Sequence, residues 1–242
     1  MRKSGFRVNE RLQLRCSVKI QDVIKHERDA LLGESLVIIP FLGSGLLPFA
    51  AVTEPGVLVR SPMFLRSMHP VTLEPLPGRD RGAAFVQVCP SLKYKFLWVH
   101  ADNDKYRDDY KTFLRVFHKV IEDLPRQIAV DHLYNRDRAK ALGTPFIRTV
   151  LAQESINSSH GAGYEKSRSR NGLGAFGRDH KMDTITLMKL CGMRSPKKGQ
   201  PLSAEMRAHI HQVAEIYGMK VTDLEKEIND LMEVAAFRPP AR

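Results

Sequence analysis

Two adjacent residues, Asp131 and His132, could carry hydrolytic chemistry. They follow the apolar run 128–130, so we expect them at the end of a strand. A carboxylate can bind a divalent metal ion, and a neutral imidazole can take the proton from an attacking water. Hydrolysis of a phosphodiester uses both, because the metal offsets the charge that develops on the phosphoryl group. The pair therefore predicts a metal-dependent phosphodiesterase, with Asp131 binding the metal and His132 acting as general base.

Further polar side chains gather in the Gly-rich and basic segment 153–182. A long polar segment supplies little core, so a localised site is expected there. We predict that His160 and His180 complete, with Asp131, a site for Mg²⁺, Mn²⁺ or Zn²⁺, since such side chains are common ligands of divalent metals. The other polar candidates for the site are Asn157, Asn171 and Glu165.

The Asp-His pair resembles the opening Asp-His of the HNH, or ββα-metal, endonucleases. In that family an Asn follows, and then a further His or Asn ligand on a helix. In this chain the continuation is Asn157 with His160, or Asn171 with His180 nine residues later. The resemblance covers at most about fifty residues, from 131 to 180. It implies nuclease activity with a bound divalent metal.

The charge of the chain is concentrated in one segment. The formal net charge is +11, and residues 136–198 hold 13 Lys and Arg against 5 Asp and Glu. Such an excess attracts polyanions, of which phosphate backbones are the commonest. We therefore predict that the protein acts on nucleic acid. The expected nucleic-acid-binding residues are Arg136, Arg138, Lys166, Arg168, Arg170, Lys197 and Lys198.

Three alternatives to the nuclease stay open. The protein could be a non-catalytic adaptor whose basic segment 136–198 docks on nucleic acid or on an acidic protein. It could be an enzyme that uses the same arginines on a small anionic substrate. In a purely structural role, Asp131 and His132 would hydrogen-bond to fix a loop. Nucleoside triphosphate binding is not among these alternatives, because Glu165 stands where a Walker A loop has the glycine before its lysine.

The elements that must position these residues follow from hydrophobic patterning and turn signals. The expected strands are residues 36–41, 56–59, 83–89, 94–100, 127–130 and 146–152. One long amphipathic helix is expected, because apolar residues recur at three- and four-residue intervals from Tyr106 to Leu124, and Pro125 ends it. A short helix at 135–142 would stop at Gly143.

Beyond residue 182 the pattern becomes helical. Asp183 and Ser203 are expected to cap helices over 184–191 and up to residue 217, and a third helix follows from Thr222. The fold class is therefore α+β, or α/β, with a mixed sheet, one long amphipathic helix and a C-terminal helical unit. We expect residues 1–182 to form the core unit, and residues 183–242 to form the helical unit packed on it.

Composition and targeting signals indicate a cytoplasmic protein. The N-terminal residues lack the compact apolar stretch and the cleavage site of a secretory signal. The uncharged run 36–52 is interrupted by Pro40 and Pro48, so a membrane span is not expected. Cys16, Cys89 and Cys191 lie far apart, which is typical of reduced thiols. A protein exported by a signal-peptide-independent system would have the same features.

Overall fold

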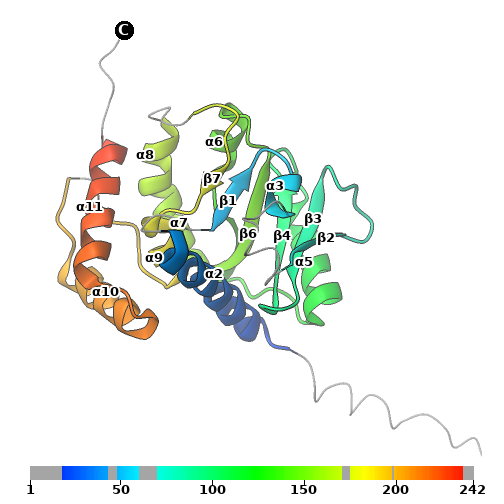
Figure 1. The fold of residues 1–242 in the computed structure, drawn as a ribbon, viewed down its shortest axis with the longest axis horizontal. Helices are drawn as coiled ribbons and strands as arrows, with labels where there is room; N and C mark the ends of the chain where they lie inside the picture. The colour runs from blue at the N-terminus through cyan, green and yellow to red at the C-terminus, as the bar shows by residue number, and fades with distance from the viewer. Residues whose placement is uncertain (1–17, 43–47, 60–69, 171–174, 198, 237–242) are drawn as a thin grey trace, which may run out of the picture.

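The computed structural model describes residues 18–42, 48–59, 70–170, 175–197 and 199–236. They form an α+β fold around one curled sheet with the shape of a half-barrel (Figure 1). The strands are β1 (Phe49–Val52), β2 (Thr72–Pro75), β3 (Ala84–Cys89), β4 (Tyr94–His100), β5 (Ile128–His132), β6 (Phe146–Gln153) and β7 (His180–Lys181). Their order is β2-β3-β4-β6-β1-β7, and β5 also pairs with β6.

Every strand pairing among the described residues is antiparallel, so the expected mixed sheet is wrong. Parallel neighbours need a long crossover connection, whereas antiparallel neighbours can be joined by a short one. Here a tight turn joins β3 to β4, and the short helix α6 (Arg136–Ala141) lies between β5 and its partner β6. Each of these two connections therefore places the next strand beside the previous one.

Strands β1 and β5 share one edge of β6. Thr149 of β6 faces both Leu97 of β4 and His132 of β5, so β4 and β5 lie on opposite edges. Ile147 lies two residues before Thr149 and faces Ala51 of β1. Strand β1 therefore pairs with the same edge of β6 as β5, next to the part that β5 occupies. Strand β7 then extends the sheet beyond β1. The segment that follows β5 is thereby brought close to β7.

Two hydrophobic clusters lie against the sheet. The buried residues of β4 alternate, with Trp98 in one hydrophobic cluster and Leu97 in the other, because successive side chains of a strand point to opposite faces. Helix α2 (Ile20–Leu42) packs against β4 and β6, and α5 (Tyr106–Phe113) packs against β4. None of the helices in the described ranges has both the length and the apolar character of a membrane span.

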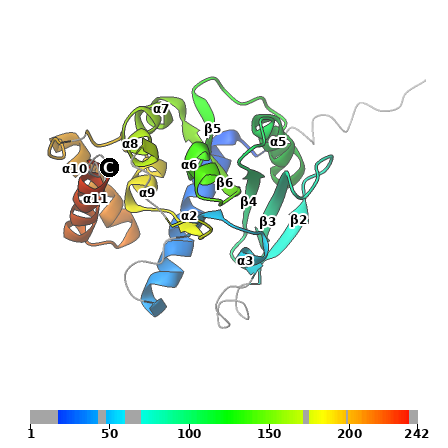
Figure 2. The same ribbon diagram turned by 90° about the horizontal axis from the view of Figure 1, so that it is seen from above.

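The remaining helices gather at one end of the molecule. They are α7 (Glu154–Ala162), α8 (Tyr164–Arg170), α9 (Thr184–Leu190), α10 (Ala204–Tyr217) and α11 (Val221–Ala236). Helices α10 and α11 lie at the end opposite β2 and β3 (Figure 1 and Figure 2). A third hydrophobic cluster joins Ile185, Ile210 and Ile228 of α9, α10 and α11 to Tyr164 of α8. The division into units 1–182 and 183–242 stays a prediction, and this cluster crosses its boundary.

Several local predictions are confirmed. Residues 83–89 and 94–100 correspond to β3 and β4. Asp183 caps α9, where its Oδ1 accepts from the Thr186 backbone N–H at 2.8 Å. Ser203 caps α10, where its Oγ accepts from the Met206 backbone N–H at 3.2 Å. These features depend on a few neighbouring residues, which the sequence displays directly.

Other local predictions are wrong. Residues 36–41 lie within α2, and residues 56–59 form the short helix α3 (Gly56–Val59), because a short apolar run fits a buried helix as well as a strand. The expected helix 106–124 ends in the π-helical turn η1 (Leu114–His118), after which Lys119 has a φ of 60°. The Gly-rich segment 153–182 is not one loop, because it contains α7 and α8.

Candidate functional site

The structure does not bring Asp131 and His132 together, although both lie at the end of β5 as predicted. Neighbouring residues of a strand point to opposite faces of the sheet. Asp131 is buried towards α9, where Lys189 Nζ lies 2.8 Å from its Oδ2. His132 packs against Tyr106 of α5, with 4.3 Å between the ring centroids. The carboxylate and the imidazole therefore have separate surroundings.

Lys189 is the buried cation that Asp131 pairs with. Its side chain is 1% exposed, and its Nζ also lies 2.6 Å from Glu165 Oε1 of α8. Burial raises the pKa of Asp131 to about 6, although the Lys189 ammonium opposes this rise. Burial also lowers the pKa of Lys189, but the two carboxylates more than compensate and hold it above its ordinary value. The ammonium thus stabilises both carboxylates in a place that water barely reaches.

His132 is a poor match for a general base. Burial lowers its pKa to about 3, and the positive charges of Arg136 and Arg107 act in the same direction. A general base works best when its pKa lies near the pH of the reaction. The ring is neutral at physiological pH but holds a proton only weakly, and Tyr106 covers it.

The expected metal ligands do not converge either. His160 of α7 is buried, and its Nε2 lies 2.9 Å from the Met193 carbonyl oxygen. His180 of β7 stacks on Tyr134, with 4.6 Å between the rings. Within the ranges that the structure describes, no three His, Cys, Asp or Glu side chains form a group that could hold a metal ion. The Lys189 ammonium also occupies the position beside Asp131 that a cation would need, so these residues do not fit the predicted metal.

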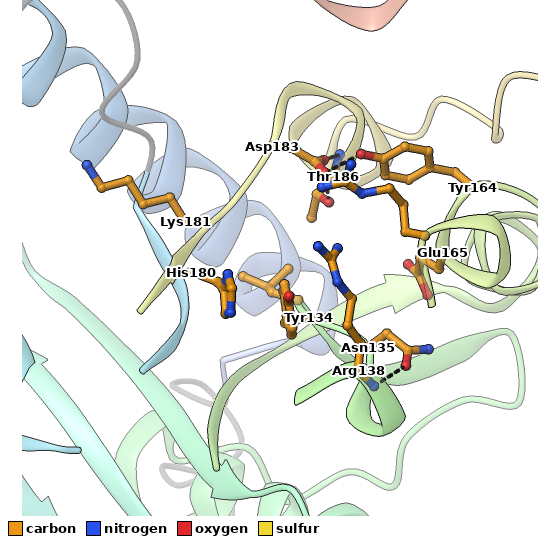
Figure 3. A pocket seen from close by; sticks show the side chains of 11 residues that line it. Tyr134, Asn135, Arg138, Tyr164, Glu165, His180, Lys181, Asp183 and Thr186 are labelled. Atoms are coloured by element: carbon orange, nitrogen blue, oxygen red, sulfur yellow. Dashed lines mark hydrogen bonds between the residues drawn. The ribbon is translucent and has the colours of Figure 1, made fainter. Parts of the chain in front are cut away.

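The structure instead assembles a cavity of about 100 Å³ on the same side of β5 as Asp131. Arg138 of α6 reaches it between Tyr134 and Glu165, while His180 lies on the other side of Tyr134 (Figure 3). The side chain of Lys181 extends away from this group. The residues that line the cavity are Leu133, Tyr134, Asn135, Arg138, Tyr164, Glu165, Arg168, His180, Lys181, Asp183 and Thr186.

Local sequence explains how these side chains are positioned. Asn135 caps α6, because its Oδ1 accepts from the Arg138 backbone N–H at 3.0 Å (Figure 3). The cap fixes the first turn of α6 and with it the direction of the Arg138 side chain. The Arg138 guanidinium carbon then lies 5.0 Å from the centre of the Tyr134 ring, a cation–π contact. Arg168 makes a longer contact of the same kind, at 6.0 Å, with Tyr164.

Two arginines and two carboxylates line the cavity. Burial lowers the pKa of Arg138, and the positive charge of Arg168 lowers it further. Burial likewise lowers the pKa of His180, and Arg138 contributes to this shift. The two like charges repel each other where water screens them only in part. The negative charge of Asp183 acts in the opposite direction on the pKa of Arg138.

The two carboxylates at the cavity are already bound to other groups. Asp183 Oδ2 accepts from the Tyr164 hydroxyl at 2.5 Å, and Asp183 Oδ1 caps α9. Glu165 Oε1 accepts from Lys189 Nζ.

Comparison with family models, with curated proteins and with solved structures finds no match to this chain. The function must therefore be argued from the residues and their geometry.

The other predicted nucleic-acid-binding residues have varied surroundings. Arg136 Nε donates to the Ala101 carbonyl oxygen at 3.0 Å, so part of its side chain is engaged within the fold. Lys166 and Lys197 are exposed. The backbone of Arg170 belongs to α8, but its side chain, like the whole of Lys198 and Asn171, lies outside the described residues. Asn157 is half-buried on α7 and does not line the cavity.

Neither Tyr134 nor Lys189 is among the site residues that the sequence predicts. Lys189 interrupts the otherwise apolar run 187–191, and a lysine in such a position signals a buried ion pair. Tyr134 gives no comparable signal, because its role depends on contacts with β7 and α6 that are distant in the chain.

Proposed function

We propose that the protein binds nucleic acid through phosphate contacts centred on the cavity between α6, α8 and β7. The observation that carries this proposal is the approach of Arg138 and Arg168, which are thirty residues apart in the sequence, to one cavity. Guanidinium groups bind phosphate oxygens with two parallel hydrogen bonds, which makes arginine well suited to this role. The exposed Lys166 lies on the same helix as Arg168 and would add a further positive charge near the same phosphates.

The proposal favours binding over metal-dependent hydrolysis. Asp131 is held by Lys189, and His132 is half-buried on the other face of the sheet against Tyr106. We therefore assign no catalytic step to this pair. The two arginines at the cavity support the non-catalytic nucleic-acid-binding alternative, which needs no bound metal.

Fluorescence anisotropy with labelled DNA and RNA oligonucleotides, titrated at several salt concentrations, tests this proposal. We expect binding that weakens as salt rises, because phosphate contacts release counterions. The double variant Arg138→Gln with Arg168→Gln should bind less tightly, and the slope of log K against log salt should fall by about two. The matched control is Arg115→Gln, which removes an exposed charge from η1, and it should leave both quantities unchanged.

Two results would contradict the proposal. One is parent-level binding by a folded double variant, and the other is an equal loss of binding in Arg115→Gln. The same samples, incubated with Mg²⁺, Mn²⁺ or Zn²⁺ and then with a chelator, show whether the nucleic acid is also cleaved. Metal-dependent cleavage that a folded His132→Ala variant loses would restore the nuclease hypothesis.

A further inference from the structure

Phe176 is an aromatic side chain that the fold leaves open to solvent. Its exposed fraction is 77%, the highest among the exposed large hydrophobic side chains of the described residues. The others in that group are aliphatic, namely Val18, Ile121, Ile216 and Val234. A single exposed apolar side chain is common on protein surfaces and by itself indicates nothing. Phe176 combines its exposure with an aromatic ring and with a backbone that is held in place.

The backbone around Phe176 is held against the turn that follows α6. The Gly177 N–H donates to the Leu142 carbonyl oxygen at 2.7 Å. The ring itself lies over Gly143, where a Cβ atom would come within 2.8 Å of the ring carbon Cζ. The ring therefore has a defined position without a ligand, which reduces the entropy that binding would otherwise cost.

This turn brings Phe176 close to the arginines of the proposed binding surface. The Leu142 N–H donates to the Arg138 carbonyl oxygen at 3.0 Å, so the backbone that holds Phe176 follows Arg138 by one helical turn, about 5 Å. Arg178 is exposed two residues after Phe176, and its carbonyl oxygen accepts from the Thr144 hydroxyl at 3.0 Å. Phosphates of one strand of B-form DNA are about 3.4 Å apart along the axis. The ring and the two arginines therefore lie within reach of a few consecutive nucleotides.

We propose that Phe176 stacks on an unpaired nucleobase, so that the protein binds single-stranded nucleic acid in preference to a duplex. The inference rests on the proposed nucleic-acid binding and adds the strandedness of the ligand. In a duplex the bases stack on one another and present their edges in the grooves. In a single strand the flat face of a base is accessible, and proteins bind such strands with aromatic side chains beside a basic groove.

The surroundings of the ring favour a nucleobase over an apolar protein partner. A protein-binding patch of that kind consists of several contiguous apolar side chains. The three residues that follow the ring are Gly177, Arg178 and Asp179, which add no apolar side chain to it. The Asp179 carboxylate accepts from the Thr53 backbone N–H at 2.7 Å and from the Thr53 hydroxyl at 2.8 Å, so it is engaged within the fold.

Fluorescence anisotropy with one labelled oligonucleotide, measured as a single strand and after annealing to its complement at the same salt concentration, tests the inference. We expect the parent to bind the single strand more tightly. Phe176→Ala should weaken single-strand binding by about fivefold or more, the usual loss for one stacked base, and should leave duplex binding unchanged. The matched control is Ile121→Ala, because Ile121 is 73% exposed but lies between η1 and β5. It should change neither affinity.

Phe176→Trp reports on stacking directly, because a nucleobase stacked on an indole ring quenches its fluorescence. The parent contains one tryptophan, Trp98, which is fully buried and supplies a constant background. We expect the single strand to quench the emission of Phe176→Trp, while the parent and an Ile121→Trp control keep theirs. A merely structural role of the ring would produce no such quenching.

The possible results separate the two proposals. Equal single-strand affinity of the parent and a folded Phe176→Ala would overturn this inference and leave the proposed function standing. A duplex that binds the parent as tightly as the single strand would do the same. No binding to any oligonucleotide would overturn the proposed function and this inference with it. If Phe176→Ala fails to fold, Phe176→Trp decides, and unquenched emission from the complex with a single strand would reject the stacking.

Discussion

The buried carboxyl of Glu27 should make the stability of the protein fall as the pH rises from acid to neutral. Glu27 lies on α2 and is 1% exposed. Its Oε1 accepts from the Tyr110 hydroxyl, and its Oε2 accepts from the Leu151 backbone N–H at 2.9 Å. Burial raises the pKa of Glu27 from 4.5 to about 8, although both hydrogen bonds act against the rise. The folded protein therefore holds a proton on Glu27 that the unfolded chain has already lost.

The sign and size of the effect follow from proton linkage. Between pH 4.5 and about 8 the folded state binds more protons than the unfolded state, so the free energy of unfolding decreases with pH. Each unit of pKa difference corresponds to about 1.4 kcal/mol, so the whole shift corresponds to about 5 kcal/mol. About 3 to 4 kcal/mol of this loss should fall between pH 5 and pH 8. Above the pKa of the folded state the contribution is constant.

Urea unfolding of the parent and of Glu27→Gln, measured from pH 5 to pH 9, isolates this contribution. Glutamine keeps an acceptor for the Leu151 N–H and cannot ionise, so Glu27→Gln should gain stability relative to the parent as the pH rises. The control is Glu74→Gln, because Glu74 is exposed on β2, and its profile should run parallel to that of the parent. A difference between parent and Glu27→Gln that does not change with pH would refute the reasoning.

Three further predictions concern single contacts. Lys189→Met should reduce the free energy of unfolding by about 3–5 kcal/mol, because it leaves the buried Asp131 carboxylate without its cation. Chemical denaturation should show that adding Asp131→Asn recovers part of this loss, and a double variant less stable than Lys189→Met would contradict the pairing. Asn135→Ala should cost about 1 kcal/mol through loss of the α6 cap and should also weaken oligonucleotide binding, and a change in stability alone would argue against its positioning of Arg138. Gly143→Ala should lower the free energy of unfolding by about 1–2 kcal/mol, because Gly143 has a φ of +66°, and an unchanged urea midpoint would show that the turn can rearrange.

The sequence predicts those parts of the fold that depend on neighbouring residues. The caps at Asp183 and Ser203 and the strands β3 and β4 follow from local patterns, and the structure confirms them. The apolar run 36–41 was misread because its length and composition suit a strand, whereas it continues a helix that begins at Ile20. Local signals carry no information on which element a short apolar run joins.

Local sequence signals predict the candidate site less well than they predict the fold. The sequence placed Asp131 and His132 correctly at a strand end, but adjacency in the sequence sends the two side chains to opposite faces of the sheet. Arg138, Arg168 and His180 were all named as candidates without any means of grouping them. Their convergence depends on β5 and β1 pairing with successive parts of one edge of β6. The pairing of β1 with β6 joins segments almost a hundred residues apart.

That arrangement of β5 and β1 makes one wall of the cavity depend on a long-range pairing. His180 belongs to β7, which pairs with β1, and in the described part of the chain β1 pairs with β6 at Ala51 and Val52. Such a long-range pairing closes a large loop, so it should form late in folding. Arg138 and Arg168 lie on helices that do not depend on β1 in this way. An anion held between these arginines and His180 would therefore keep the N-terminal strand in place, so that ligand occupancy and completion of the sheet are thermodynamically linked.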